Sequence, residues 1–262
     1  MEEVVPEADH QALQPMLSES TWSERAVLDP IAQDANRLLG GHEDTAWVMD
    51  DSGIPKKGIH SVGVGRQWCG QRGKVDNGQV GVFAALSRGS AVTLMDERLF
   101  LPKAWTEDDA RCPAAGIPKA QRGFQRKADL ALTMITHARQ QGMGFAWVGV
   151  DGFYGSDPAF LRALADQGEI FVGDVHKDQR IYREDPQPIV PPPQGRRGAP
   201  PTKREAQTPA MRVDHWGQQP PASAWQAAIL ILAILPISGY EGAGSRWGMS
   251  VLAAGGRRTG TT

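Results

Sequence analysis

Two aspartates at the ends of apolar runs are the residues of this sequence best placed to do chemistry. Asp51 ends the run TAWVMDD (residues 45–51), with Asp50 beside it, and Asp151 ends the run FAWVGVD (residues 145–151). Short apolar runs are typical of buried strands, and ligands of α/β sheets bind near the carboxyl ends of strands. Carboxylates gathered there could hold Mg²⁺, which prefers oxygen ligands and supports phosphoryl transfer. From the spacing alone, acids that cap turns or face solvent are the commoner interpretation.

The segments around these acids predict alternating strands and helices. Residues 10–40 read as helical, with Trp22-Ser23 offering a cap and Pro30 expected to kink or end a first helix. A turn is expected over residues 52–55 and a loop over residues 102–123. The expected strands cover residues 45–51, 60–68, 78–88, 91–100, 145–151 and 169–175, and the later helices cover residues 125–141 and 157–167.

This order of elements predicts one mixed sheet. The first strands have no helices between them, so they should form an antiparallel meander, and the later strand–helix–strand unit should add parallel strands. Helices should then flank the sheet, and Asp51 and Asp151 should both lie at the carboxyl ends of strands. The clearest helix, residues 125–141, should turn Leu130, Met134 and Ile135 toward the sheet.

Composition narrows the classes of protein. The 262 residues carry a formal net charge of −2, so any binding of nucleic acid must use local basic patches. Cys69 and Cys112 stand in no metal-ligand spacing, which suits a reducing cytoplasm. The acidic N-terminus lacks a signal-peptide pattern, and the apolar run at residues 229–235 is too short to span a membrane.

Changes in composition divide the chain into four parts. Residues 1–44 are expected to form an N-terminal helical segment and residues 45–180 the α/β core. Residues 186–201 are rich in Pro and Gly, so residues 181–225 read as a linker with a short strand within residues 211–216. Residues 226–262 are apolar and then Gly-rich without a core periodicity, and we expect low order there.

A series of motifs in a fixed order carries a resemblance to a known family. The sequence resembles the IS701-type transposases of the IS4-like DDE group over about residues 10 to 225. The matching stretches are DDSGIPKKG (50–58), HSVGVGRQ (60–67), GKVDNGQV (73–80), DERLFLPKAW (96–105), GIP (116–118), VDGFYG (150–155), VHKDQ (175–179) and PAMRV (209–213).

This resemblance implies an RNase H-like catalytic core that cuts and rejoins DNA at the ends of an insertion element. It assigns the first catalytic and metal-binding aspartate to Asp51, with Asp50 as the fallback, and the second to Asp151. It also implies Mg²⁺ or Mn²⁺ as the cofactor, DNA as the partner, and a second copy of the chain as a candidate partner.

The third carboxylate of the family, a glutamate on a late helix, has no match. Tyr182-Arg183-Glu184 resembles that motif superficially, but it lies too soon after Asp151 and before the Pro-rich segment. Glu241 in the tail is a weaker candidate still. The expectation is therefore a truncated and inactive copy of a transposase, because losing a metal ligand removes the geometry that catalysis needs.

Four basic residues are candidates for contacting the DNA backbone: Lys56, Lys57, Arg126 and Lys127. Solvent-exposed turns and loops are the alternative for all of them. For the whole chain, the alternatives to an active transposase are a non-catalytic remnant that still binds DNA and a hydrolytic nuclease on the same fold. The ordered motifs favour the transposase lineage over the simple nuclease.

Overall fold

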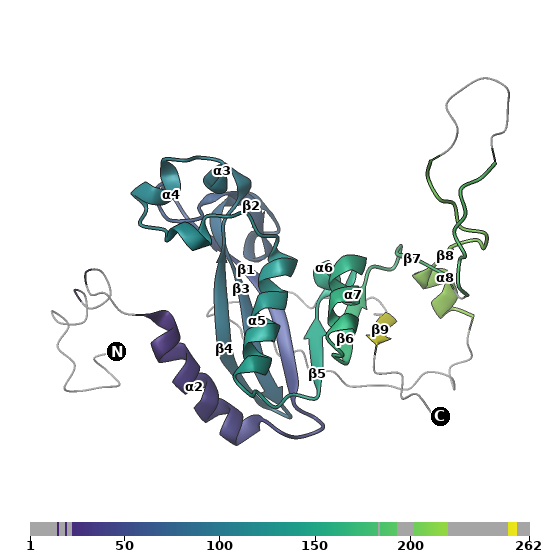
Figure 1. The fold of residues 1–262 in the computed structure, drawn as a ribbon, viewed down its shortest axis with the longest axis horizontal. Coiled ribbons are helices and arrows are strands. Elements are labelled where there is room, and N and C mark those ends of the chain that lie inside the picture. Colours follow the sequence, from purple (N-terminus) through teal and green to yellow (C-terminus); the bar gives the residue numbers. More distant parts are fainter. Residues whose placement is uncertain are drawn as a thin grey trace.

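The centre of the protein is a seven-stranded mixed sheet in a computed structural model that describes residues 15, 19, 23–182, 184–192, 202–219 and 251–255 (Figure 1). β3 pairs antiparallel with β1, β2 and β4, whereas β1 and β5, and then β5 and β6, pair parallel. The predicted mixed sheet is therefore confirmed. Its strands are β1 (Ala46–Pro55), β2 (Gly65–Cys69), β3 (Lys74–Arg88), β4 (Ala91–Phe100), β5 (Trp147–Val150), β6 (Phe171–Val175) and β9 (Val251–Gly255).

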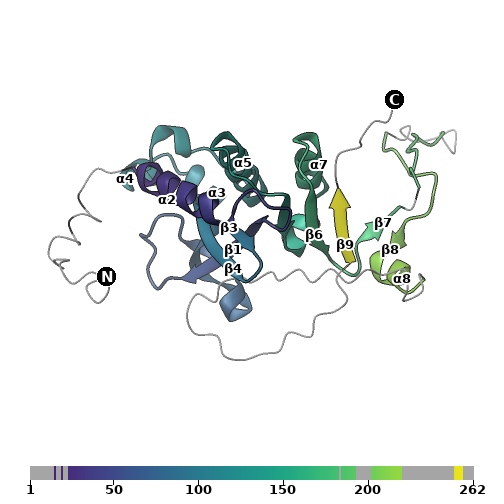
Figure 2. The ribbon, with the colours of Figure 1, turned by 90° about the horizontal axis from the view of Figure 1, so that it is seen from below.

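Three helices lie on the same face of the sheet: α2 (Glu24–Leu39), α5 (Lys127–Gln140) and α7 (Pro158–Asp166) (Figure 2). Asp157 caps α7 as expected, because its carboxylate accepts hydrogen bonds from the backbone N–H groups of Ala159 and Phe160. The shorter elements are α3 (Lys103–Thr106), α4 (Arg111–Ala114), α6 (Gly152–Gly155), β7 (Arg180–Ile181), β8 (Met211–Arg212), α8 (Val213–Gly217) and 3₁₀ turns at Gly70–Arg72 and Lys119–Gln121.

The main core forms between α5 and the sheet. Leu130, Met134 and Ile135 of α5 are buried, as their helical spacing predicts, and they pack in one cluster with Trp47 and Met49 of β1. Because alternate residues of a strand point to opposite faces, Asp51 belongs to the same face of β1 as these two core residues. The core thus fixes both the strand that carries Asp51 and the helix that faces it.

The first strand is longer than the sequence indicated. The turn expected over residues 52–55 is wrong, because β1 continues through Gly53 to Pro55 and pairs with residues 78–82 of β3. The strand expected over residues 60–68 is wrong in its first half: Gly63 adopts a positive φ, and the backbone oxygen of Val64 accepts a hydrogen bond from Trp105. The expected loop over residues 102–123 instead holds short helices that pack with Val64 in a second small core.

The N-terminal helix also departs from expectation, because α2 runs through Pro30 without ending there. Two side-chain contacts hold the helix in the turn just before the proline. Arg25 contacts Asp96 of β4 at 2.5 Å, and Asp29 contacts His137 of α5 at 3.0 Å. These tertiary contacts offset the missing backbone hydrogen bond.

One prediction for the later part of the chain needs correction. Residues 211–216 were expected to form one strand, but only Met211–Arg212 pair with β7 before α8 begins. Low order was expected for residues 226–262; the part of this tail that the structure describes, Val251–Gly255, pairs antiparallel with β6. This pairing satisfies backbone groups that the edge of β6 would otherwise expose. Residues 226–250 and 256–262 lie outside the described residues.

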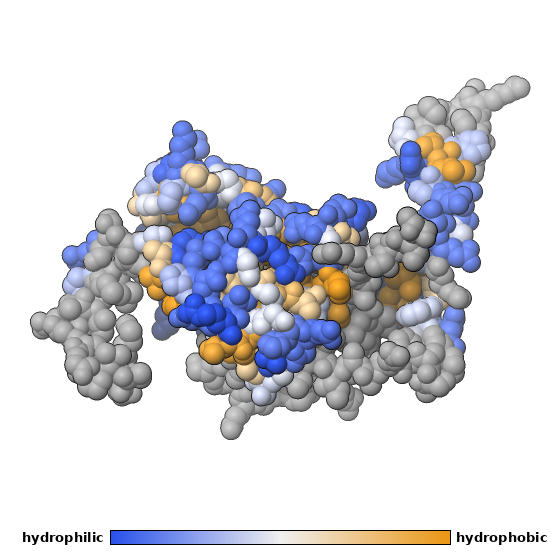
Figure 3. Space-filling model, turned by 60° about the horizontal axis from the view of Figure 1, so that its bottom comes forward, coloured by the Kyte–Doolittle hydropathy of each residue, from blue (hydrophilic) through white to orange (hydrophobic). Residues whose placement is uncertain are grey.

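The surface mixes polar and apolar side chains. On the face drawn in Figure 3, apolar side chains form separate patches among polar ones. Val27 and Ile31 of α2 are about half exposed. In the described part of the chain, no helix is both long enough and apolar enough to cross a membrane.

Candidate active site

The sheet register brings the predicted aspartates together. The last pairs of the parallel strands form one row, Met49 with Val150 and Val150 with Gly173. Asp50 directly follows Met49 in the sequence, and Asp151 directly follows Val150. Neighbouring strands lie about 4.8 Å apart, so Asp50, Asp51 and Asp151 lie side by side where the parallel pairing of β1 with β5 ends. Asp151 follows β5 as predicted, but the prediction that Asp51 lies at the end of its strand is wrong, because β1 continues to Pro55.

Asp51 faces α5, where it meets a lysine. The ammonium of Lys127, the first residue of α5, forms an ion pair with Oδ2 of Asp51. Both side chains are mostly buried, with 17 % and 18 % of their surfaces exposed. The structure thus joins a predicted catalytic residue to a predicted DNA-binding residue that lies 76 positions away.

Asp151 is held by the short helix that follows it. Its Oδ1 accepts hydrogen bonds from the backbone N–H groups of Phe153 at 3.1 Å and Tyr154 at 3.3 Å. The hydroxyl of Tyr154 is buried and has no hydrogen-bond partner among the described residues. The charges of Asp50, Asp51 and Asp151 add to burial in raising the pKa of Tyr154, which shows that its ring belongs to the same site.

The carboxylates destabilise one another's charges. Burial raises the pKa of Asp50 to about 6, and the neighbouring charge of Asp151 adds to the effect, although a hydrogen bond from the N–H of Asp51 opposes it. Burial likewise raises the pKa of Asp151, and the charges of Asp51 and Asp174 contribute. Carboxyl groups that resist ionisation in a shared site are typical of functional sites, and a bound cation would relieve their repulsion.

Asp174 is an acidic neighbour that the sequence interpretation missed. It follows Gly173 of the row described above, so it occupies on β6 the position that Asp151 occupies after β5. Burial raises its pKa. The rule that singled out Asp51 and Asp151, an acid at the end of an expected strand, also applies to Asp174 in the strand expected over residues 169–175.

The other predicted basic residues lie farther from the carboxylates. Because β1 continues to Pro55, Lys56 is carried about 16 Å along the strand direction from Asp51, and Lys57 farther still. Arg126 is half exposed and pairs with Asp129 at 2.7 Å and Asp157 at 3.0 Å. A role in binding DNA stays a prediction for all three.

The donor set fits a magnesium or manganese ion held by few protein ligands. Among the described residues, no three His, Cys, Asp or Glu side chains are grouped so that they could hold a metal ion. Mg²⁺ is, however, commonly bound through one or two carboxylates, with water and phosphate oxygens completing its coordination. Asp51 and Asp151 provide such oxygens, and the unpartnered hydroxyl of Tyr154 marks a polar interior beside them.

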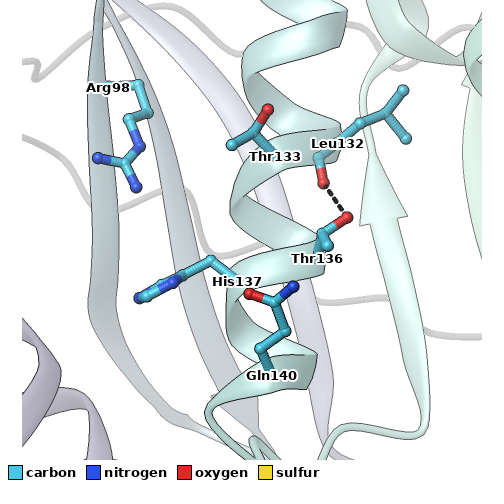
Figure 4. A pocket seen from close by; sticks show the side chains of 6 residues that line it. All are labelled: Arg98, Leu132, Thr133, Thr136, His137 and Gln140. Carbon is cyan, nitrogen blue, oxygen red and sulfur yellow. Dashed lines mark hydrogen bonds between the residues drawn. The ribbon is translucent and has the colours of Figure 1, made fainter. Parts of the chain in front are cut away.

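A separate hollow lies along α5 and holds none of these carboxylates (Figure 4). It is bordered by Arg98 of β4 and by residues of the later turns of α5, including His137. The hydroxyl of Thr136 donates to the backbone oxygen of Leu132 at 2.9 Å, so this side chain is already satisfied. The hollow is lined by Arg98, Leu132, Thr133, Thr136, His137 and Gln140.

Comparison with known proteins decides the family. The family described as DDE superfamily endonuclease matches residues 1–230, which is most of the chain and includes every carboxylate of the site. The chain belongs to this family. Membership supports a nuclease-like or transposase-like function for this DDE superfamily endonuclease, and divalent metals are the general cofactors of the superfamily.

Comparison of structures and of curated proteins adds little. The chain is similar to the NurA nuclease from Sulfolobus solfataricus with a TM-score of 0.25 and 8 % sequence identity. That match covers 66 % of this endonuclease and 62 % of that chain, so less than two thirds of the other protein's length is spanned. Similarity at this level supports no conclusion about fold or function. No curated protein matches the sequence.

Proposed function

We propose that this DDE superfamily endonuclease is a transposase-type catalytic core, of the IS701 group within the IS4-like transposases, that binds Mg²⁺ or Mn²⁺ and DNA. The observation that supports this most is the register of β1 and β5. It gathers Asp50, Asp51 and Asp151 side by side where the parallel pairing of the two strands ends, and burial raises the pKa of Asp50 and Asp151. Residues 45–180 would form the core and residues 181–225 the start of an insertion.

Asp51 and Asp151 would hold the metal, with Asp50 as the fallback for Asp51. When bound, divalent metal would activate an attacking hydroxyl and stabilise the leaving oxygen of the cut DNA strand. The two backbone hydrogen bonds to Oδ1 of Asp151 fix its orientation and leave its other oxygen without a hydrogen bond from the described residues. Lys56, Lys57 and Arg126 would contact phosphates outside the metal site, which positions DNA without reading its sequence.

We infer further that the chain binds metal and DNA without cutting the strand. Among the described residues no third donor joins Asp51 and Asp151 in a metal-binding group, and Glu184 is exposed beyond β7. Strand cleavage depends on the in-line geometry that the metal's position sets, so an incomplete ligand set costs orders of magnitude in rate. The function is then that of a non-catalytic form that binds DNA.

The test combines binding with cleavage. Titration of EDTA-treated protein with Mn²⁺, followed by electron paramagnetic resonance, should show binding that Asp51→Asn and Asp151→Asn each remove. Supercoiled plasmid incubated with the protein and Mg²⁺ or Mn²⁺ should stay intact. Cleavage that disappears in Asp51→Ala would overturn the proposed inactivity. Mn²⁺ binding that is unchanged in both Asn variants would overturn the assignment of the site.

A further inference from the structure

The ion pair between Lys127 and Asp51 is the starting point. The ammonium contacts the same carboxylate that the proposed function assigns to the metal. The Nζ atom also lies 5.7 Å from the ring centroid of Phe100 and 5.4 Å from that of Phe153. A cation near two aromatic rings and a buried carboxylate is held in a defined place and does not sample solvent freely.

The preferences of the helix do not explain this lysine. Lys127 opens α5, and a positive charge in the first turn is disfavoured by the helix dipole. Asp129 is the acidic residue that a helix dipole favours in the first turn, and its carboxylate accepts a hydrogen bond from the backbone N–H of Arg126. The side chain of Arg126 also pairs with Asp157 of α7. These contacts fix the start of the helix, so Lys127 is aimed at Asp51 in spite of the dipole.

The balance of charge around Lys127 points to a counter-ion. Within the described residues, Asp51 has its ion pair with Lys127, whereas Asp50, Asp151 and Asp174 have no ion pair. One ammonium therefore faces Asp51 directly and acts on the charge of Asp50, while Asp151 adds a further negative charge beside Asp50. Carboxylates that lie close together in a partly buried site repel one another, so an added cation is favoured among them.

We propose that Lys127 is a tethered counter-ion that a divalent metal must displace from Asp51. This inference rests on the proposed function, which makes Asp51 a metal ligand. An ammonium and a divalent ion at one carboxylate repel each other within a few ångströms, in a site too buried for water to screen them fully. The displaced ammonium stays on its flexible stem beside the metal, where a DNA phosphate is the anion available to it.

The experiment measures Mn²⁺ affinity by electron paramagnetic resonance on EDTA-treated full-length chain. Lys127→Met keeps the length and the apolar stem of the side chain but removes its charge, so Mn²⁺ should bind on the order of tenfold more tightly. Lys127→Arg keeps the charge and should bind Mn²⁺ as the original protein does. The matched control is Lys103→Met, because Lys103 lies over the ring of Phe124 at 5.3 Å and has no carboxylate partner in the described residues.

A second measurement tests the linkage from the side of DNA. Fluorescence anisotropy with a labelled duplex should show that Mn²⁺ raises the affinity of the original chain for DNA. The increase should be several-fold smaller in Lys127→Met, because the ammonium that metal would release is gone. Lys127→Gln, checked by circular dichroism, serves as a second neutral variant if Lys127→Met fails to fold.

The outcomes separate the two proposals. Equal or weaker Mn²⁺ binding in the neutral variants, with Asp51→Asn still abolishing it, would overturn the counter-ion role and leave the proposed metal site in place. The absence of Mn²⁺ binding in every protein would overturn both. Tighter binding in Lys103→Met as well as in Lys127→Met would show a general effect of net charge and would overturn the specific role of Lys127.

Discussion

The charge of Asp50 should lower the free energy of unfolding at neutral pH, and a substitution at this position tests that prediction. Its pKa is raised to about 6 from 3.8, chiefly because burial penalises the charged form. A carboxyl with a raised pKa binds its proton more tightly in the folded state than in the unfolded one. Folding therefore becomes less favourable as pH rises from about 4 to about 6, and the penalty is constant above that.

The size of the penalty follows from the pKa. A rise from 3.8 to about 6 corresponds to about 3 kcal/mol at neutral pH. Asp50→Asn removes the charge but keeps an oxygen that can accept the 2.7 Å hydrogen bond from the N–H of Asp51. We therefore expect Asp50→Asn to raise the free energy of unfolding by about 1–3 kcal/mol at pH 7.5, with the gain vanishing near pH 4.

Urea unfolding in EDTA-containing buffers from pH 4 to pH 8, followed by tryptophan fluorescence, measures this directly. Asp129→Asn is the control, because the hydrogen bond from Arg126 lowers the pKa of Asp129. The charge of Asp129 stabilises the folded state above about pH 4, so its removal should not stabilise the protein. If Asp50→Asn were no more stable than the original chain at pH 7.5, or were equally stabilised at pH 4, the electrostatic reasoning would be refuted.

Two further predictions concern the support of the site. Gly155→Ala should lower the free energy of unfolding by about 3 kcal/mol and weaken Mn²⁺ binding, because the added methyl would overlap the backbone carbonyl of Asp174. The control is Gly123→Ala, whose added methyl meets open space and should leave the free energy of unfolding nearly unchanged. Arg139→Met should lower the free energy of unfolding by about 3 kcal/mol, because it leaves the buried carboxylate of Glu169 without its ion pair. The double variant Arg139→Met/Glu169→Gln should recover most of that stability. The first explanation would be contradicted if Gly155→Ala left the free energy of unfolding unchanged. The second would be contradicted if the losses of stability from Arg139→Met and Glu169→Gln were additive in the double variant.

Local sequence patterns were enough to place the two predicted aspartates. The apolar runs before Asp51 and Asp151 form β1 and β5, and the helix between them makes those strands parallel. The parallel pairing brings Asp151, which follows β5, beside Asp50 and Asp51, although these two lie within β1 and not at its end. The helix over residues 125–141 and the cap at Asp157 were also predicted, because periodicity and capping act over a few residues.

Long-range pairing decided what the sequence did not reveal. Gly53 and Pro55 are turn residues by local preference, but pairing with β3 keeps them in a strand and moves Lys56 away from Asp51. The contact between Lys127 and Asp51 joins residues 76 positions apart, so no local pattern could indicate it. Asp174 could have been found by the rule that found Asp151, and the pairing of β6 with β5 places the two acids on neighbouring strands.

The row of acids also explains how the carboxylates among the described residues could attract a cation without surrounding it. Asp50, Asp151 and Asp174 each follow the row Met49, Val150 and Gly173 on neighbouring strands. Strands about 4.8 Å apart spread three such positions over nearly 10 Å, whereas a magnesium ion needs its ligands at about 2.0–2.1 Å. Neighbouring acids can share one ion, but the row cannot enclose it. Closing the site requires a donor from outside the plane of the sheet, and a carboxylate on a helix packed over this edge would provide that direction.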